Sequence, residues 1–354
     1  MGKMNAERDF PMKTTHKILN MNANAISCIP DNSLHLVVTS PPYPMIEMWD
    51  EQFASQDNTI SDALHSGACY EAFEKMHRVL DEVWKECDRV LIDNGFVCIN
   101  IGDATRTIDG SFALFSNHSR IIQSFLKMGY TVLPDIHWRK QSNAPNKFMG
   151  SGMYPAGAYV TYEHEYILIF RKGNKRVFNG DSKKARQESA YFWEERNVWF
   201  SDLWDIKGTS QQIAKKNAER TRNASFPFDI PYRLINMYSV KGDIILDPFC
   251  GMGTTTLACM AAQRNSIGVE ISADITALAE EYINSRLADL NAVIDKRLSD
   301  HMAFIEELPT DKKEKCYINI PHGFFVKTRQ ETALHVERIT DIRYSENGFE
   351  CSYS

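Results

Sequence analysis

The hydrophobic positions of the 354-residue chain form strand-like and helix-like segments that alternate. Residues 34–38 (LHLVV) are a continuous β-favouring run that ends at Thr-Ser-Pro-Pro, as expected of a buried parallel strand followed by a turn. Hydrophobic residues at three- and four-residue steps between positions 70 and 91 predict a helix that packs one face on a sheet. Further strands are predicted at residues 95–101, 132–138, 165–171, 243–246 and 266–270, and further helices at residues 119–128, 254–263 and 273–290.

The alternation predicts an α/β sheet protein with one interruption. In residues 172–223 the hydrophobic periodicity fades and charged residues mix with aromatic ones, which favours an inserted region. The alternation resumes in residues 224–290, whereas residues 291–354 carry no pattern that predicts an element. The predicted organisation is therefore a first half of the sheet at residues 1–171, then the insertion, the second half and an extension of unknown role.

Composition narrows the class of protein. With 43% hydrophobic and 24% charged residues, the chain can bury one large core. No apolar run approaches the length of a membrane span, and the opening MGKMNAERDF lacks the apolar stretch of a signal peptide, so we expect a cytoplasmic protein without a membrane partner. The eight cysteines show no Cys-x-x-Cys spacing, so neither a metal site nor a disulfide framework is expected.

The net charge of −6 conceals an uneven distribution. Residues 137–222 hold 16 Lys or Arg against 9 Asp or Glu, a local balance of +7 that leaves −13 for the rest of the chain. A local positive face is enough to neutralise phosphates, so the segment fits a DNA-binding surface. An ordinary solvated surface explains the same charges equally well.

A glycine-rich turn lies between a predicted strand and a predicted helix. It reads Asp-Pro-Phe-Cys-Gly-Met-Gly-Thr-Thr over residues 247–255. Gly251 and Gly253 let the backbone turn tightly and approach a ligand, and the helix start offers free N–H groups, as in sites for nucleotide-like cofactors. No lysine lies in the turn, which disfavours a nucleoside triphosphate loop.

Two acidic residues accompany this turn. Asp247 suits the ammonium group of a ligand with an amino acid end. Glu270 closes the next predicted strand, where an acidic residue commonly accepts hydrogen bonds from both ribose hydroxyls. The alternative for the turn alone is a purely structural role.

A second turn, Thr-Ser-Pro-Pro-Tyr at residues 39–43, ends the first predicted strand. The two prolines fix the backbone and remove two N–H donors, so the turn presents carbonyl groups and the Ser40 hydroxyl as acceptors. Such acceptors suit the exocyclic amino group of a base, because holding both of its protons favours a more nucleophilic nitrogen. Tyr43 can then stack on a base that is flipped out of the duplex. A rigid turn at the sheet edge is the alternative for this motif alone.

Together the two turns resemble the motifs of the DNA amino methyltransferases. The catalytic motif of that family is Asp/Asn/Ser-Pro-Pro-Tyr/Phe, and the matching residues here are Ser40, Pro41, Pro42 and Tyr43. The cofactor motif contains Phe-x-Gly-x-Gly, which matches residues 249–253. The catalytic motif precedes the cofactor motif, which is the circularly permuted order of the β class.

The resemblance covers about residues 17–287 and implies a circularly permuted, Rossmann-like methyltransferase fold. It also implies S-adenosylmethionine as cofactor, double-stranded DNA as substrate and strands beside the base pocket at residues 138–140 and 163–172. The implied cofactor site comprises Asp247, Pro248, Phe249, Gly251, Gly253, Thr254, Thr255, Glu270, Asn22, Phe226 and Pro227. Asn22 departs from the family, which usually has an aspartate there, although its carbonyl oxygen can accept a hydrogen bond from an adenine amino group.

The resemblance implies direct methyl transfer to an amino nitrogen without a covalent enzyme intermediate. Ser40 at the first motif position leans towards N4 of cytosine, while N6 of adenine stays an alternative, as does a DNA-binding regulator without catalysis. Methylation at carbon 5 needs a nucleophilic cysteine that typically follows a proline, and Cys250 follows Phe249. We expect a restriction-modification context with a separate endonuclease, and both a monomer and a dimer stay open.

The target-recognition surface is expected in the insertion at residues 172–223, where phosphate contacts fix the register of the duplex. The candidate DNA-binding residues are Lys172, Lys175, Arg176, Lys183, Lys184 and Arg186.

Overall fold

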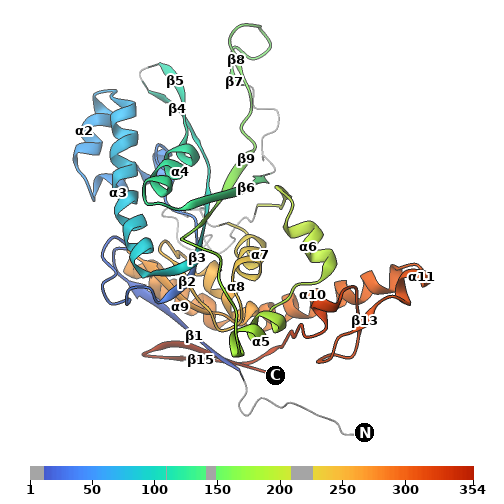
Figure 1. Ribbon diagram of the computed structural model, residues 1–354. Coiled ribbons are helices and arrows are strands. Elements are labelled where there is room, and N and C mark those ends of the chain that lie inside the picture. Colours follow the sequence, from blue (N-terminus) through green and yellow to red (C-terminus); the bar gives the residue numbers. More distant parts are fainter. Residues whose placement is uncertain (1–11, 109, 141–148, 209–225) are drawn as a thin grey trace, which may run out of the picture.

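The computed structural model describes residues 12–108, 110–140, 149–208 and 226–354. Within these residues, ten strands form one mixed sheet with helices on both faces (Figure 1). In spatial order the strands are β10 (Leu203–Asp205), β6 (Thr131–Arg139), β9 (His164–Arg171), β3 (Leu91–Ile101), β2 (Leu34–Thr39), β11 (Ile244–Asp247), β12 (Asn265–Glu270), β1 (Lys13–Asn20), β16 (Gly348–Tyr353) and β15 (Ile339–Ser345). Residues 209–223 of the predicted insertion lie outside the described residues.

The centre of the sheet is parallel. Strands β3, β2, β11, β12 and β1 run in one direction, so their carboxyl ends share an edge, which we call the carboxyl edge. Strand β9 pairs antiparallel with β3 and β6, and its amino end therefore lies at the same edge. We call the opposite side of the sheet the amino edge. The predicted α/β class with a Rossmann-like sheet is confirmed.

Alternate residues of the buried strands pack on opposite faces of the sheet. In β9, Ile167 and Ile169 belong to one hydrophobic cluster, and Leu168 and Phe170 belong to another. Helices cover each cluster, which explains why these strands are apolar on both sides. The first cluster includes α7 (Asp229–Tyr238), α8 (Thr254–Ala262) and α10 (Leu287–Glu307), and the second includes α3 (Cys69–Val90) and α4 (Asn117–Lys127). No helix of the described residues is long and apolar enough to cross a membrane.

Two hairpins extend from the carboxyl edge at the top of Figure 1. They are β4 (Ala104–Ile108) with β5 (Ser111–Phe115), and β7 (Met149–Gly150) with β8 (Ala158–Tyr159). The rings of Phe112 and Tyr159 join them by stacking, with centroids 4.5 Å apart. The short helices between β2 and α3 are η1 (Glu47–Trp49), α1 (Asp50–Ala54) and α2 (Thr59–His65).

The extension at residues 291–354 continues the sheet, although its sequence predicted no element. Strand β16 pairs antiparallel with β1 and with β15, so the β15–β16 hairpin covers the edge that β1 would otherwise expose. The extension also holds α11 (Thr310–Lys313), β13 (Tyr317–Ile318), β14 (Phe325–Val326) and η3 (Arg329–Glu331).

One predicted helix is wrong in its extent. The helix predicted at residues 273–290 is divided into α9 (Ala273–Asn284) and α10, which continues into the extension. Ser285 lies at the break, and its hydroxyl donates a hydrogen bond to the Tyr282 carbonyl at 2.7 Å. Serine and asparagine side chains compete with the helix for backbone groups, which accounts for the break.

The extension also anchors the inserted region. The insertion forms α5 (Asp181–Glu188) and α6 (Trp193–Trp199), and β10 joins the sheet beside β6. Arg297 of α10 donates to both carboxylate oxygens of Glu195 in α6, at 2.6 and 2.8 Å. His301 Nδ1 lies 2.7 Å from Glu194. Residues 291–354 therefore support the position of α6.

We expect Arg297→Met to lower the free energy of unfolding by about 3 kcal/mol, because it leaves the Glu195 carboxylate, whose side chain is only 13% exposed, without its charged partner. Lys296→Met is the matched control on the same helix, since Lys296 pairs with Asp300 on the surface and both side chains are mostly exposed. Urea unfolding of both variants checks this. Equal stability losses in the two variants would contradict the role given to the buried pair.

Candidate functional site

The two sequence motifs lie next to each other on the carboxyl edge. Strand β2 ends at Thr39, directly before Ser40, and β11 ends at Asp247. These strands are parallel neighbours, with Leu246 opposite Val37. Residues 208 positions apart in the sequence therefore meet at one place.

The Asp247 carboxylate connects the two motifs. Its Oδ1 accepts a hydrogen bond from the Thr39 hydroxyl at 2.6 Å and from the backbone N–H of Phe249 at 3.1 Å. Its Oδ2 accepts from the Thr255 hydroxyl at 2.6 Å. Burial raises the pKa of Asp247 to about 6, and these hydrogen bonds oppose the shift without cancelling it. Its predicted pairing with an ammonium group stays a prediction.

The glycine turn has the conformation that its sequence predicts. Gly251 and Gly253 have φ of 48° and 80°, in the left-handed region that favours glycine. A Cβ on Gly253 would lie 2.6 Å from the side chain of Ile283, whereas a Cβ on Gly251 would meet nothing within 4 Å. The turn is thus packed behind Gly253 and open at Gly251, and Thr254 begins α8.

Glu270 lies beside the open part of this turn. Its Oε2 accepts from the Gly251 N–H at 3.2 Å, and its Oε1 accepts from the Ser272 N–H at 2.9 Å. The carboxylate is half-buried and keeps further acceptor capacity, because each of its oxygens has two lone pairs. An open turn beside a carboxylate acceptor fits a ligand that carries hydroxyl groups and an ammonium group.

The remaining predicted cofactor residues lie near the carboxyl edge and differ in how deeply they are buried. Asn22 follows β1, whose Asn20 lies opposite Glu270. The side-chain amide of Asn22 donates a hydrogen bond to Gln56 at 3.2 Å. Phe226 belongs to the core, and Pro227 is buried two residues before α7 begins. Pro248 is buried too, and Phe249 packs edge-on against Trp84. The structure brings Asn22 and Phe249 to the carboxyl edge, and places Phe226 in the hydrophobic core.

The catalytic turn at residues 40–43 is bound to β3 and β9. The Tyr43 hydroxyl donates to Glu165 Oε2 at 2.7 Å and accepts from Asn100 Nδ2 at 2.8 Å, and Ser40 Oγ lies 3.2 Å from the same hydroxyl. Burial and the Glu165 charge raise the pKa of Tyr43 well above its ordinary value, so the phenol keeps its proton. Stacking of Tyr43 on a flipped base stays a prediction.

Sequence reasoning gave no individual role to three residues of this network, although two of them lie in the segments that the resemblance places beside the base pocket. Asn100 comes from β3 and Glu165 from β9, and Lys140 Nζ donates to Glu165 Oε1 at 2.9 Å. Asn100 and Glu165 are polar residues in otherwise apolar strands, and that is the signal the sequence carried. Their convergence on Tyr43 follows from the antiparallel pairing of β9 with β3, which the hydrophobic pattern does not disclose.

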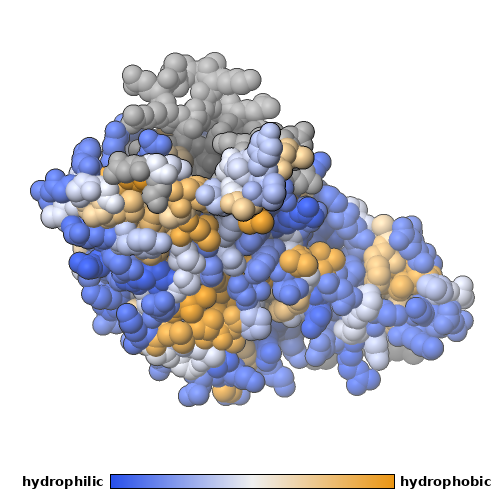
Figure 2. Space-filling model, turned by 90° about the horizontal axis from the view of Figure 1, so that it is seen from above, coloured by the Kyte–Doolittle hydropathy of each residue, from blue (hydrophilic) through white to orange (hydrophobic). Residues whose placement is uncertain are grey.

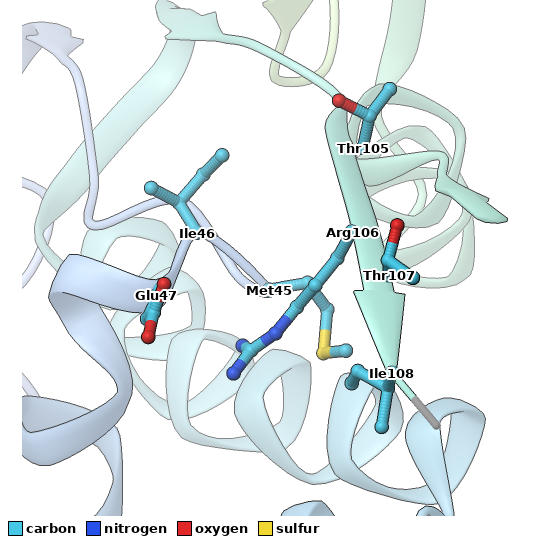
Figure 3. Close-up of a pocket in the computed structure, with 7 residues that line it drawn as sticks. All are labelled: Met45, Ile46, Glu47, Thr105, Arg106, Thr107 and Ile108. Carbon is cyan, nitrogen blue, oxygen red and sulfur yellow. The ribbon is translucent and has the colours of Figure 1, made fainter. Parts of the chain in front are cut away.

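A pocket adjoins the catalytic turn (Figure 3). Its lining residues are Met45, Ile46, Glu47, Thr105, Arg106, Thr107 and Ile108. Arg106 makes hydrogen bonds of 2.9 and 2.6 Å to the two Asp50 carboxylate oxygens, so its charge already has a partner. None of these residues was predicted as a site residue. Figure 2 views the molecule from the side of the two hairpins and shows hydrophobic patches on a mostly hydrophilic face.

Two of the basic residues predicted to bind DNA lie on the amino edge. Strand β9 ends there at Arg171, and Lys172 follows with its Nζ 3.2 Å from an Asp88 carboxylate oxygen. Arg176 donates to both carboxylate oxygens of Asp243, which directly precedes β11, at 2.6 and 2.9 Å. Both side chains therefore have partners within the protein.

Helix α5, which holds three more of these residues, lies near the same edge (Figure 1). Just after α5, Ser189 Oγ accepts from the backbone N–H of Lys241, close to the start of β11. The structure does not bring α5 to the catalytic turn. The DNA-binding role of Lys175, Lys183, Lys184 and Arg186 stays a prediction, and their placement argues against it.

We expect Asp247→Asn to alter how stability depends on pH. A carboxyl group with a pKa of about 6 in the folded protein binds more protons in the folded state than in the unfolded state between about pH 4 and 6. The free energy of unfolding of the wild type therefore falls as the pH rises through that range. Asparagine does not titrate. The variant-minus-wild-type difference in unfolding free energy should therefore rise by about 2 to 3 kcal/mol between pH 4 and 7.

Denaturant unfolding of the cofactor-free proteins at several pH values measures this difference. Asp300→Asn, on the surface of α10, is the matched loss of a carboxylate. A pH-independent difference for Asp247→Asn would contradict the expected effect.

The chain matches a known family over most of its length. Residues 34–281 match the DNA methylase family of N6 and N4 methyltransferases. The chain is 50% identical over 328 residues to the type II methyltransferase M.MthZI of Methanothermobacter thermautotrophicus, covering 92% of this chain and 91% of that protein. It is 49% identical over 281 residues to the type II methyltransferase M.MjaI of Methanocaldococcus jannaschii, covering 76% and 91%.

A solved structure supports the same relationship. The TTHA0409 protein of Thermus thermophilus, complexed with S-adenosyl-L-methionine, superposes with a TM-score of 0.59 and 30% sequence identity, covering 76% of this chain and 93% of that one. S-adenosylmethionine is the cofactor, and the open glycine turn beside Glu270 fits it. The chain therefore belongs to the family of S-adenosylmethionine-dependent DNA amino methyltransferases.

Proposed function

We propose that this protein methylates the N4 amino group of cytosine at a specific sequence in duplex DNA. The observation that carries the proposal is the 2.6 Å hydrogen bond from Thr39 to Asp247, which joins the catalytic turn to the glycine turn. A methyl donor in one turn and an amino group in the other would then be neighbours, and such positioning supplies much of the rate of a direct transfer.

The chain's own residues bind and orient both reactants in this proposal. S-adenosylmethionine supplies an activated methyl group on a sulfonium. Glu270 accepts hydrogen bonds from ribose hydroxyls, and Ser40 Oγ with the carbonyl groups of its turn accepts those of the target amino group. The base reaches this part-buried turn only after it leaves the duplex.

The state of Cys250 supports an amino target over carbon 5. Methylation at carbon 5 requires a thiolate nucleophile, and burial raises the pKa of the Cys250 thiol well above its ordinary value. The thiol also packs under the glycine turn, where a Cβ on Gly268 would lie 2.9 Å from it. Cys250 is therefore a structural residue of the cofactor turn.

The neutral hydroxyl of Ser40 supports cytosine as the target base. The amino group of cytosine adjoins ring nitrogen N3, an acceptor that a carboxylate would repel and a hydroxyl tolerates. Adenine has an acceptor at N1 beside its amino group, so this argument supports compatibility with cytosine, and the pocket walls contribute to the choice. The type II designation of both relatives supports a place in a restriction-modification system.

The carboxyl edge is the proposed DNA surface. Arg139 ends β6 with a side chain that is 70% exposed and lies 3.8 Å from Glu163, and Asp205 of β10 lies opposite it, followed two residues later by the exposed Lys207. Both basic residues lie at the edge that carries the catalytic turn. Their phosphate contacts would position the duplex over that turn.

Mass spectrometry of nucleosides from DNA treated with the protein and S-adenosylmethionine should detect N4-methylcytosine. The physical reason is the neutral acceptor that Ser40 presents beside cytosine N3. DNA from a methylation-free host is the substrate, and untreated DNA is the control. N6-methyladenine as the sole product would refute cytosine as the target and would leave the amino methyltransferase assignment intact.

Substituting Arg139 and Lys207 together with alanine should weaken DNA binding and reduce the slope of log affinity against log salt by about 2, since each lost phosphate contact removes about 0.9. The comparison variant replaces Lys183, Lys184 and Arg186 of α5. Fluorescence anisotropy over a salt series measures both. The opposite ranking would place the duplex on α5, as the charge distribution along the sequence suggests.

A further inference from the structure

Five side chains at the catalytic turn form one hydrogen-bond chain. Ser40 Oγ lies 3.2 Å from the Tyr43 hydroxyl, which lies 2.7 Å from Glu165 Oε2. Asn100 Nδ2 lies 2.8 Å from both the Tyr43 hydroxyl and Glu165 Oε2. Lys140 Nζ lies 2.9 Å from Glu165 Oε1.

The donor in each of these contacts follows from elementary chemistry. The Glu165 carboxylate only accepts, so the Tyr43 hydroxyl donates its single proton to it. The Tyr43 oxygen is then left with two lone pairs, and Asn100 Nδ2 donates to one of them. The Ser40 hydroxyl is the remaining neighbour, so it donates to the other.

Burial makes this direction hard to reverse. Asn100 is 2% exposed and Glu165 is 9% exposed, so water does not replace a lost partner. If the Tyr43 proton turned towards Ser40, the oxygens of Tyr43 and Glu165 would face each other at 2.7 Å without a proton between them. The raised pKa of Tyr43 agrees with a phenol that keeps its proton.

We propose that Glu165 is a positioning residue that fixes the Ser40 hydroxyl as a hydrogen-bond acceptor for the target amino group. With its proton directed to Tyr43, Ser40 Oγ presents lone pairs to the site. A freely rotating hydroxyl would instead spend part of its time with its proton facing an amino group, which has no good acceptor to offer. This inference rests on the proposed methyl transfer to an exocyclic amine.

The test is a double-mutant cycle on the single-turnover rate of methyl transfer at saturating S-adenosylmethionine and DNA. Glu165→Gln should slow transfer about tenfold or more, because an amide can donate to Tyr43 and reverse the chain. In the Ser40→Ala background the same change should alter the rate by less than about twofold, since the hydroxyl that it orients is gone. S-adenosylmethionine affinity, measured by calorimetry, should be unchanged.

Glu82→Gln is the matched control, because it makes the same chemical change on the surface of α3, away from the catalytic turn, at a side chain that is 55% exposed. It should keep a rate within about twofold of the wild type. A wild-type rate in Glu165→Gln, or effects of Glu165→Gln and Ser40→Ala that multiply, would overturn the inference. A wild type that methylates no amino group would refute the proposed function itself, which distinguishes the two failures.

Tyr43→Phe tests the same inference if Glu165→Gln does not fold. A thermal melt shows whether Glu165→Gln folds. Tyr43→Phe removes the acceptor of the Ser40 proton and leaves the Glu165 pair with Lys140 in place. The single-turnover rate should again fall about tenfold or more, with no multiplication in the Ser40→Ala background. Multiplying effects would overturn the inference here too.

Discussion

The buried carboxylate of Asp247 is the constraint on which the site depends. A carboxylate with so little solvent needs donors from the protein, and Thr39 and Thr255 supply them from β2 and from the helix after the glycine turn. Because one hydroxyl comes from each motif, the hydrogen bonds to this one carboxylate fix the distance between the catalytic turn and the glycine turn. The parallel pairing of β2 with β11 alone would set the strand spacing and leave the turns free to diverge.

The antiparallel strand β9 adds a charged side chain to the site that the parallel strands form. The turns after the parallel strands β2 and β11 hold the two motifs, and β9 brings the charged Glu165 to the Tyr43 hydroxyl at the same edge. Lys140 at the end of β6 balances that charge. The catalytic turn therefore depends on four strands from the first half of the sheet, β2, β3, β6 and β9, and the glycine turn depends on β11 and β12.

The sequence predicted the central strands, whose burial is almost wholly apolar, and missed β1, whose burial is partly polar. Strands β2 and β11 and their turns follow from apolar runs that end in proline or glycine. Strand β1 escaped notice because its inward residues include Thr14 and His16, which hydrogen-bond to each other and to Tyr353 and Ser266. Burial lowers the pKa of His16 to about 3, so it is neutral there. Charge counting identified a basic segment but carried no information about which edge it occupies.

The pairing of β1 has a consequence for how the chain folds. This early strand lies between β12, about 250 residues later, and β16, more than 330 residues later. Contacts this distant require the closure of very long loops, which gives a high contact order and slow folding. During synthesis, both edges of β1 therefore stay unpaired until the second half of the sheet has left the ribosome. Because exposed lysine and threonine residues alternate with buried polar residues in β1, the unpaired strand has few hydrophobic residues through which it could aggregate.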